Sequence, residues 1–195
     1  MKNTILITIS LSLCLSCKGP LKKENTDIKI YDNSIFSIID INSKIEILAD
    51  SISLPEGPLW DEESNSLLFT DIINNKVLSW NEKDGVKDYI SPSGNTGYAP
   101  NSGEALVGAN ALNFDAKGNL ILCQMGDRRV SIIKNSPTSK PNFETLIDNY
   151  NGKRLNSPND IIISSDGFYY FSDPAFGFLN LDTFKFVESD LREID

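Results

Sequence analysis

The stretch that decides the fold is NDIIISSDGFYYFSD, residues 159–173, in which two apolar runs flank an Asp-Gly pair. Short β-branched and aromatic runs on either side of such a pair are typical of a β-hairpin. The stretch NALNFDAKGNLILCQ, residues 110–124, has the same layout around a Lys-Gly pair. A third copy occupies residues 56–71, with its turn at Asn65. No segment keeps a helical period over three turns, so the sequence predicts an all-β chain.

The three hairpins recur at a regular spacing. Their turn residues Asn65, Gly118 and Gly167 are 53 and 49 residues apart. A polar residue ends the strand six residues past each turn: Asp71, Gln124 and Asp173. A four-stranded unit that recurs at about 40–50 residues is the pattern of a β-propeller blade. An unrepeated β-sandwich is the alternative, but it would not explain the matched offsets.

The composition restricts the chemistry that the chain can perform. Its 195 residues, 40% of them hydrophobic, are enough for one sizeable core. The absence of histidine removes the commonest general base and excludes a Ser-His-Asp or Cys-His site within the chain. A net charge of −9 disfavours nucleic acid and anionic membranes as partners and is compatible with cations or neutral small molecules.

Three polar residues occupy nearly the same place in the three repeats. Glu56, Asn110 and Asn159 lie eight or nine residues before their turns, at the entrance of the first strand. In a propeller this place faces the central channel, so equivalent residues of adjacent blades converge. Carboxylate and amide oxygens suit Ca²⁺, Mg²⁺ or Mn²⁺ and tolerate Zn²⁺. The alternative is that each residue serves only a local turn, such as an Asx-turn at Asn159.

The N-terminal residues 1–16 are predicted to be a signal peptide, because their apolar run is shorter than the roughly 20 residues that span a bilayer. Leu15-Ser16-Cys17 resembles a lipoprotein signal in which Cys17 is lipidated; ordinary secretion is the alternative. Residues 17–44 are predicted to be a polar tether and residues 45–195 the domain. The predicted location is the bacterial cell envelope, lipid-anchored, periplasmic or secreted, with membrane contact only through the lipid.

Three strings carry a family resemblance: EGPLWDEESNSLLFTDI, GANALNFDAKGNLILCQMGDRRV and KRLNSPNDIIISSDGFYYFSDPAFG. They resemble the SMP-30/gluconolactonase/regucalcin-like family over roughly residues 45–178, and the third resembles its bacterial gluconolactonase branch. The resemblance implies a six-bladed β-propeller, of which this chain would hold about three blades. It also implies one divalent metal in the channel and the hydrolysis of sugar lactones such as gluconolactone.

The same resemblance implies roles for individual residues. Glu56 and Asn159 match metal ligands, with Ca²⁺ expected first and Zn²⁺ or Mg²⁺ as alternatives. Asn110 matches a residue that contacts the substrate, and Gln124 is expected to be a second contact. The metal would polarise the lactone carbonyl while a carboxylate activates water. The family's base is an Asp of a later blade, expected beyond residue 195, so we expect this chain to be the N-terminal half of a longer protein and inactive alone.

Departures from the family pattern support a second hypothesis. Met125 stands where members often have histidine, and Gly108 stands where some animal members have arginine. The chain could therefore be a non-catalytic, envelope-anchored propeller that binds calcium or a glycan. Arg128 and Arg129 are expected to form salt bridges on a blade surface, and Cys123 is expected to be a buried apolar residue.

Overall fold

The computed structural model describes residues 28–40, 42–99, 106–134 and 141–186. The predicted signal peptide and Cys17 lie outside these residues. Within the described part, no helix has the length and apolar character needed to cross a membrane. The chain divides into two compact units, residues 1–47 and 48–195.

The first unit contains one described element, the short 3-10 helix η1 (Asn33–Ser37), which lies inside the predicted polar tether. Asp32 caps this helix, because its carboxylate accepts a hydrogen bond of 2.8 Å from the N–H of Ser34. A helix of one turn depends on such a cap, since it has few hydrogen bonds of its own.

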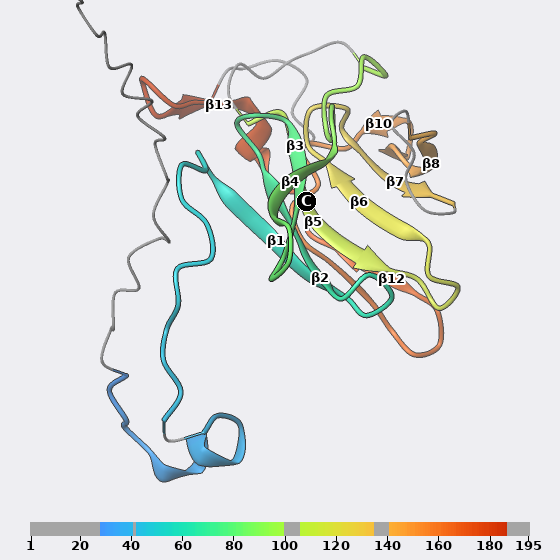
Figure 1. The fold of residues 1–195 in the computed structure, drawn as a ribbon. Helices are drawn as coiled ribbons and strands as arrows, with labels where there is room; N and C mark the ends of the chain where they lie inside the picture. The colour runs from blue at the N-terminus through green and yellow to red at the C-terminus, as the bar shows by residue number, and fades with distance from the viewer. Residues whose placement is uncertain (1–27, 41, 100–105, 135–140, 187–195) are drawn as a thin grey trace, which may run out of the picture. The chain divides into compact units, whose positions relative to one another are not determined.

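The second unit is built from antiparallel sheets (Figure 1). Sheet 1 has four strands in chain order: β1 (Pro55–Asp61), β2 (Ser66–Asp71), β3 (Lys76–Asn81) and β4 (Gly85–Ile90). Sheet 2 repeats this order with β5 (Ala109–Phe114), β6 (Leu120–Gln124), β7 (Arg129–Ile133) and β8 (Glu144–Ile147). Both first strands have a register shift near their start, between Glu56 and Leu59 and between Ala109 and Leu112. The two sheets are therefore copies of one unit, as the repeat predicted.

The third repeat consists of smaller pieces in the described residues. The predicted hairpin is present as β11 (Ile161–Ile163) paired with β12 (Tyr169–Phe171). The remaining elements are two further hairpins and a 3-10 helix: β9 (Asn149–Tyr150) with β10 (Lys153–Arg154), η2 (Ala175–Phe178), and β13 (Leu179–Asn180) with β14 (Lys185–Phe186). The all-β prediction is confirmed, with two four-stranded sheets and a third repeat made of two-stranded pairs.

The turns have the backbone geometry that their residues favour. Asn65 and Asn75 have φ of 49° and 55°, and Gly118 and Gly167 have φ of 78° and 88°. This left-handed region is accessible to glycine and, among other residues, most readily to asparagine and aspartate. The turn residues were therefore readable from the sequence.

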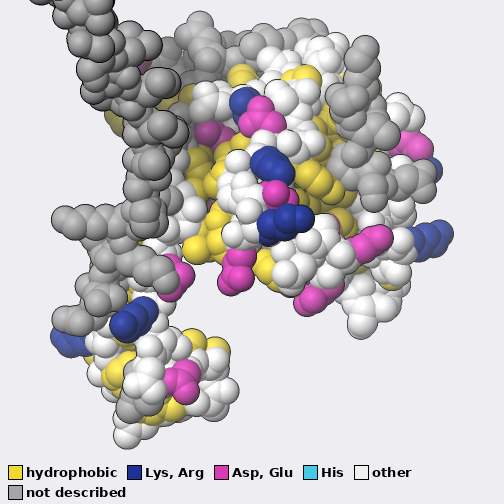
Figure 2. All heavy atoms as spheres, viewed as in Figure 1, with side chains coloured by type: hydrophobic (Ala, Val, Ile, Leu, Met, Phe, Trp, Pro, Cys, Tyr) yellow, Lys and Arg dark blue, Asp and Glu magenta, His cyan; other side chains and the backbone are white. Residues whose placement is uncertain are grey.

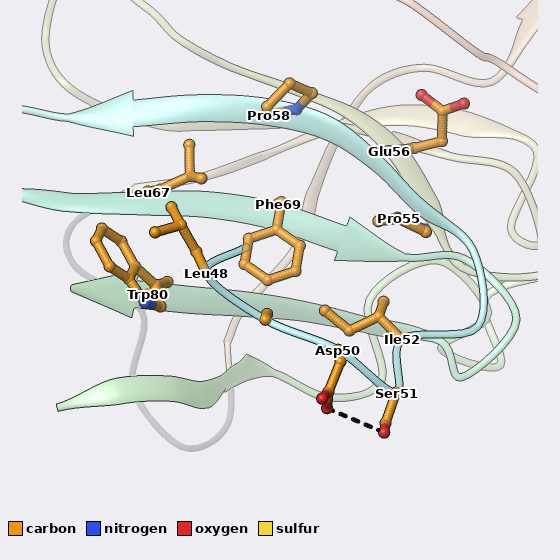
Figure 3. Close-up of a pocket in the computed structure, with 11 residues that line it drawn as sticks. Leu48, Asp50, Ser51, Ile52, Pro55, Glu56, Pro58, Leu67, Phe69 and Trp80 are labelled. Atoms are coloured by element: carbon orange, nitrogen blue, oxygen red, sulfur yellow. Dashed lines mark hydrogen bonds between the residues drawn. The ribbon is translucent and has the colours of Figure 1, made fainter. Parts of the chain in front are cut away.

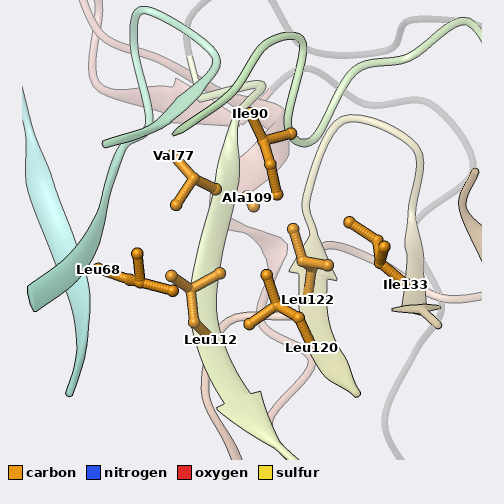
Figure 4. Packing of buried hydrophobic residues seen from close by; sticks show 8 residues of the cluster. All are labelled: Leu68, Val77, Ile90, Ala109, Leu112, Leu120, Leu122 and Ile133. Carbon is orange, nitrogen blue, oxygen red and sulfur yellow. The ribbon is translucent and has the colours of Figure 1, made fainter. Parts of the chain in front are cut away.

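Sheet 2 lies at the centre of the core, because both of its faces are covered. On one face Leu112 and Leu122 pack against Leu68 and Val77 of sheet 1 (Figure 4). On the other face Ile121 belongs to a buried cluster with residues of the third repeat. All residues of β6 and β7 are buried. A strand covered on both sides reads as a continuous apolar run, which is why β6 begins with LILC.

The surface combines charge with exposed apolar groups. On the face shown in Figure 2, acidic and basic side chains lie interspersed among apolar ones. The β11–β12 hairpin carries several of the exposed apolar side chains, including Ile162, Phe168 and Tyr170. The third repeat thus buries one side against sheet 2 and presents apolar side chains to solvent.

Candidate functional site

The entrances of the three first strands lie side by side. Glu56 and Asn110 are the second residues of β1 and β5, and Asn159 lies two residues before β11. The N–H of Ala111 donates a hydrogen bond of 3.0 Å to the carbonyl oxygen of Asn159. The Thr70 hydroxyl donates one of 3.0 Å to the carbonyl oxygen of Asn110. These bonds join sheet 1, sheet 2 and the third repeat at the level of the three polar residues.

Gly57 lies tightly against the second entrance. Its φ is +52°, and a Cβ atom built on it would lie 2.2 Å from the carbonyl oxygen of Asn110. No side chain fits in this space without moving the backbone of β5. The glycine that follows Glu56 therefore allows β1 to approach Asn110.

We expect Gly57→Ala to lower the free energy of unfolding by about 2–4 kcal/mol, because it combines left-handed backbone strain with overpacking. Denaturant unfolding measures the loss. The matched control is Gly85→Ala, since Gly85 also has a positive φ, of +67°, but a Cβ atom at this position would have no neighbour within 4 Å. It should lose only the backbone contribution, about 1–2 kcal/mol. Equal losses in the two variants would contradict the steric argument.

The side-chain oxygens of the three residues accept no hydrogen bond from the described residues. The Glu56 carboxylate is exposed and the Asn159 amide half-buried, and neither side chain forms a hydrogen bond within the described residues. Asn110 is 7% exposed, and its amide nitrogen donates to the sulfur of Met125 at 3.7 Å. The neighbouring Asp160 carboxylate accepts the N–H of Ile161 at 2.8 Å, so Asp160 rather than Asn159 serves the local backbone.

Glu56 also borders an apolar groove of about 410 Å³ on sheet 1. Leu67, Phe69 and Trp80 form much of its lining (Figure 3). The Glu56 carboxylate points away from Phe69 and Trp80 in this view. The groove therefore offers apolar contact, and among the three polar residues only Glu56 borders it.

Gln124 lies inside the protein. It is fully buried, its amide nitrogen donates to the carbonyl oxygen of Ser93 at 2.7 Å, and its amide oxygen accepts from Nε of Arg129 at 2.7 Å. Both ends of the amide are thus engaged in internal hydrogen bonds. Its substrate-binding role stays a prediction that this geometry does not favour.

The expectation that Arg128 and Arg129 lie on a blade surface was wrong, because they are only 2% and 3% exposed. Arg129 does form a salt bridge, to Asp127 at 3.3 Å, and its guanidinium lies 3.9 Å from the centre of the Tyr98 ring. Nε of Arg128 donates to the carbonyl oxygen of Leu155 at 2.5 Å. Burial lowers the pKa of Arg129, and the attraction of Asp127 opposes this change.

Asp127 was missed in the sequence. Its carboxylate is fully buried and accepts hydrogen bonds from the N–H and the hydroxyl of Thr96 besides its contact with Arg129. The sequence feature that could have revealed it is the charged string DRR, residues 127–129, which lies between two apolar runs typical of strands. Charged residues in such a place are buried only as pairs, so the string indicated an internal ion pair.

The remaining candidates for chemistry are limited. Burial raises the pKa of the Cys123 thiol, with smaller contributions from Asp160 and Asp173, so this thiol is not a nucleophile. Its burial confirms the apolar role expected for it. No group of three or more His, Cys, Asp or Glu side chains suited to a metal occurs in the part of the chain that the structure describes.

Comparison with known proteins supplies the family. The family described as SMP-30/gluconolactonase/LRE-like region matches residues 54–182. A gluconolactonase of Zymomonas mobilis is 35% identical over 159 residues, which are 82% of this chain and 42% of that protein. The structure of a gluconolactonase from Xanthomonas campestris is 25% identical with a TM-score of 0.67, covering 87% of this chain and 52% of that one. A putative gluconolactonase structure is 26% identical with a TM-score of 0.58, covering 74% and 44%.

The chain thus spans about half the length of these relatives. The matched residues 54–182 include Glu56, Asn110 and Asn159, together with all of sheets 1 and 2. The resemblance read from the three sequence strings is confirmed. This chain belongs to the SMP-30/gluconolactonase/LRE-like family.

Proposed function

We propose that the protein hydrolyses a sugar lactone, and that this chain supplies part of the site. The observation that carries the proposal is the hydrogen-bonded adjacency of the strand entrances that bear Glu56, Asn110 and Asn159. The similarity to gluconolactonases supports the same reaction class. The proposed architecture is a six-bladed propeller, of which sheets 1 and 2 and the third repeat form about three blades.

The oxygen donors fit a hard divalent cation. The Glu56 carboxylate and the Asn159 amide oxygen make no hydrogen bond within the described residues, which leaves them available as ligands. No imidazole is present anywhere in the chain, and oxygen ligands suit Ca²⁺ first, with Zn²⁺ or Mg²⁺ as alternatives. Such a cation polarises a carbonyl and stabilises the negative charge that develops on its oxygen.

The chain's own residues would hold and orient the substrate. The Met125 sulfur holds the amide nitrogen of Asn110, which leaves the amide oxygen to accept a hydrogen bond from a sugar hydroxyl. Asp71 and Asp173 already accept backbone hydrogen bonds and are therefore poor candidates for the base. We propose that the carboxylate that activates water comes from outside residues 1–195.

Metal removal tests the proposal. We expect the full-length protein to hydrolyse glucono-δ-lactone above the spontaneous rate in a pH-stat assay. EDTA should lower the rate by at least about 100-fold, since a bound cation supplies several kcal/mol of transition-state stabilisation. Added Ca²⁺, Zn²⁺ or Mg²⁺ should restore it. Turnover that chelation leaves unchanged would contradict a metal-dependent site.

The second candidate is a non-catalytic module that binds calcium or a glycan. Met125 favours it, because a buried thioether cannot transfer a proton at the place where the family resemblance leads us to expect histidine. Calcium binding without turnover on a panel of lactones would support this second function.

We further propose that residues 1–16 are a signal peptide, that Cys17 carries a lipid, and that residues 17–44 tether the domain at the bacterial envelope.

A further inference from the structure

Two carboxylates hold the segments that lead into the site. Asp71, at the end of β2, accepts hydrogen bonds from the N–H groups of Ser53 at 3.2 Å and Leu54 at 3.4 Å. These donors lie three and two residues before Glu56. One carboxylate of sheet 1 therefore fixes the backbone immediately before the proposed metal ligand.

The third repeat has the same arrangement at the same offsets. Asp173, two residues after β12, accepts hydrogen bonds of 2.9 Å from the N–H groups of Asn156 and Ser157. These donors lie three and two residues before Asn159. The recurrence in two repeats shows that this is a feature of the unit rather than an accident of one loop.

Asp71 and the segment that Asp173 holds have further hydrogen bonds that fix their positions. Asp71 is 3% exposed and also accepts a hydrogen bond of 2.7 Å from the amide nitrogen of Asn74. Burial raises its pKa, but the hydrogen bonds from Asn74, Ser53 and Leu54 outweigh this, so the pKa lies below its usual value. In the third repeat, Ser157 is held as well, because its hydroxyl accepts the N–H of Gly177 at 2.9 Å.

In sheet 2 the residue at the equivalent strand end also holds a backbone group of another segment, but it donates the hydrogen bond instead of accepting it. Gln124 takes the place of Asp71 at the end of its strand and donates to the carbonyl oxygen of Ser93. The Ser93 hydroxyl accepts the N–H of Ala109 at 3.0 Å, directly before Asn110. The group that Gln124 holds is the carbonyl oxygen of Ser93, which can only accept a hydrogen bond. The side chain at this place must therefore donate, and an amide can do so whereas the ionised carboxylate of the other two repeats cannot.

We propose that Asp71 and Asp173 are positioning residues that orient the segments carrying Glu56 and Asn159. This inference rests on the proposed function, since it assigns both residues to the same metal site. Hydrogen bonds from backbone N–H groups to an ionised carboxylate are stronger than those to a neutral acceptor. Loss of such an orienting partner typically weakens metal binding by about 10–100-fold.

The test uses Asp71→Asn and Asp173→Asn in the full-length protein, with Ca²⁺ binding measured by calorimetry. Each variant should bind Ca²⁺ about 10–100-fold more weakly than the unchanged protein. The matched control is Asp115→Asn, because Asp115 also accepts two backbone N–H groups, from Lys117 and Asn119 at 2.8 Å, but at the turn of its hairpin. The control should lose some stability and keep its Ca²⁺ affinity. Unchanged Ca²⁺ affinity in both site variants would overturn the proposal.

A second readout does not depend on metal. Hydrogen exchange should become faster at residues 53–56 in Asp71→Asn and at residues 156–159 in Asp173→Asn, but at neither segment in Asp115→Asn. Unchanged exchange would overturn the positioning role even if the metal site is real. If the wild-type protein binds none of Ca²⁺, Zn²⁺ and Mg²⁺, the proposed function fails, while faster local exchange in the variants still supports the role of the two carboxylates in ordering these segments.

Discussion

Replacing Glu56 with glutamine is expected to reduce lactone turnover by at least about 1,000-fold, or roughly 4 kcal/mol of transition-state stabilisation. The exchange keeps the size of the side chain and removes the negative charge that a hard divalent cation favours in its ligand. Initial rates of lactone hydrolysis in the full-length protein, at saturating Ca²⁺, measure the effect. Asn159→Ala should behave alike, because it removes the second proposed ligand.

The control for this prediction is Glu63→Gln. Glu63 lies in the exposed turn between β1 and β2, at the other end of sheet 1 from Glu56. Glu63→Gln removes the same charge from the same hairpin and should leave lactone turnover unchanged. Full activity in Glu56→Gln would refute the assignment of this carboxylate to the site. Equal losses in Glu56→Gln and Glu63→Gln would point to net charge rather than to a specific ligand.

Arg129→Met should lower the free energy of unfolding by about 3–5 kcal/mol, because removing one partner of a buried ion pair leaves the other charge uncompensated. Asp127 is 0% exposed and would lose its cation. The amide oxygen of Gln124 would lose its donor at the same time. Equilibrium unfolding in urea, with the slope compared between variants, gives the change.

Lys76→Met supplies the comparison, because Lys76 pairs with Asp88 at 2.8 Å on the surface of sheet 1. An exposed pair of this kind contributes about 0–1 kcal/mol. A similar small loss in Arg129→Met would mean that the Asp127–Arg129 pair adds little. A large loss would show that the buried pair stabilises the fold, in which Asp127 also accepts a hydrogen bond from Thr96.

The sequence by itself determined the all-β class, the repeat, its turns and its family. These features are encoded locally: a turn at Asn65 or Gly118 needs a left-handed residue, and the flanking strands need β-branched or aromatic residues. The matched offsets then placed Glu56, Asn110 and Asn159 at equivalent strand entrances. The repeat thus carried the information that a single motif could not.

Only the tertiary structure decided what each polar residue at a strand end does. Asp71 and Gln124 occupy equivalent places, yet one accepts from a backbone N–H and the other donates to a carbonyl. Their partners lie 18 and 31 residues away in the chain, so the spacing of residues along a strand contains no trace of them. The ion pair of Arg129 with Asp127 is local and could be read from the sequence, but the burial of Arg129 depends on Tyr98, which is distant in the chain and packs against its guanidinium. Turns and strands follow from residues that are neighbours in the sequence. Whether a buried polar side chain must donate or accept a hydrogen bond depends on segments that meet only in the folded state.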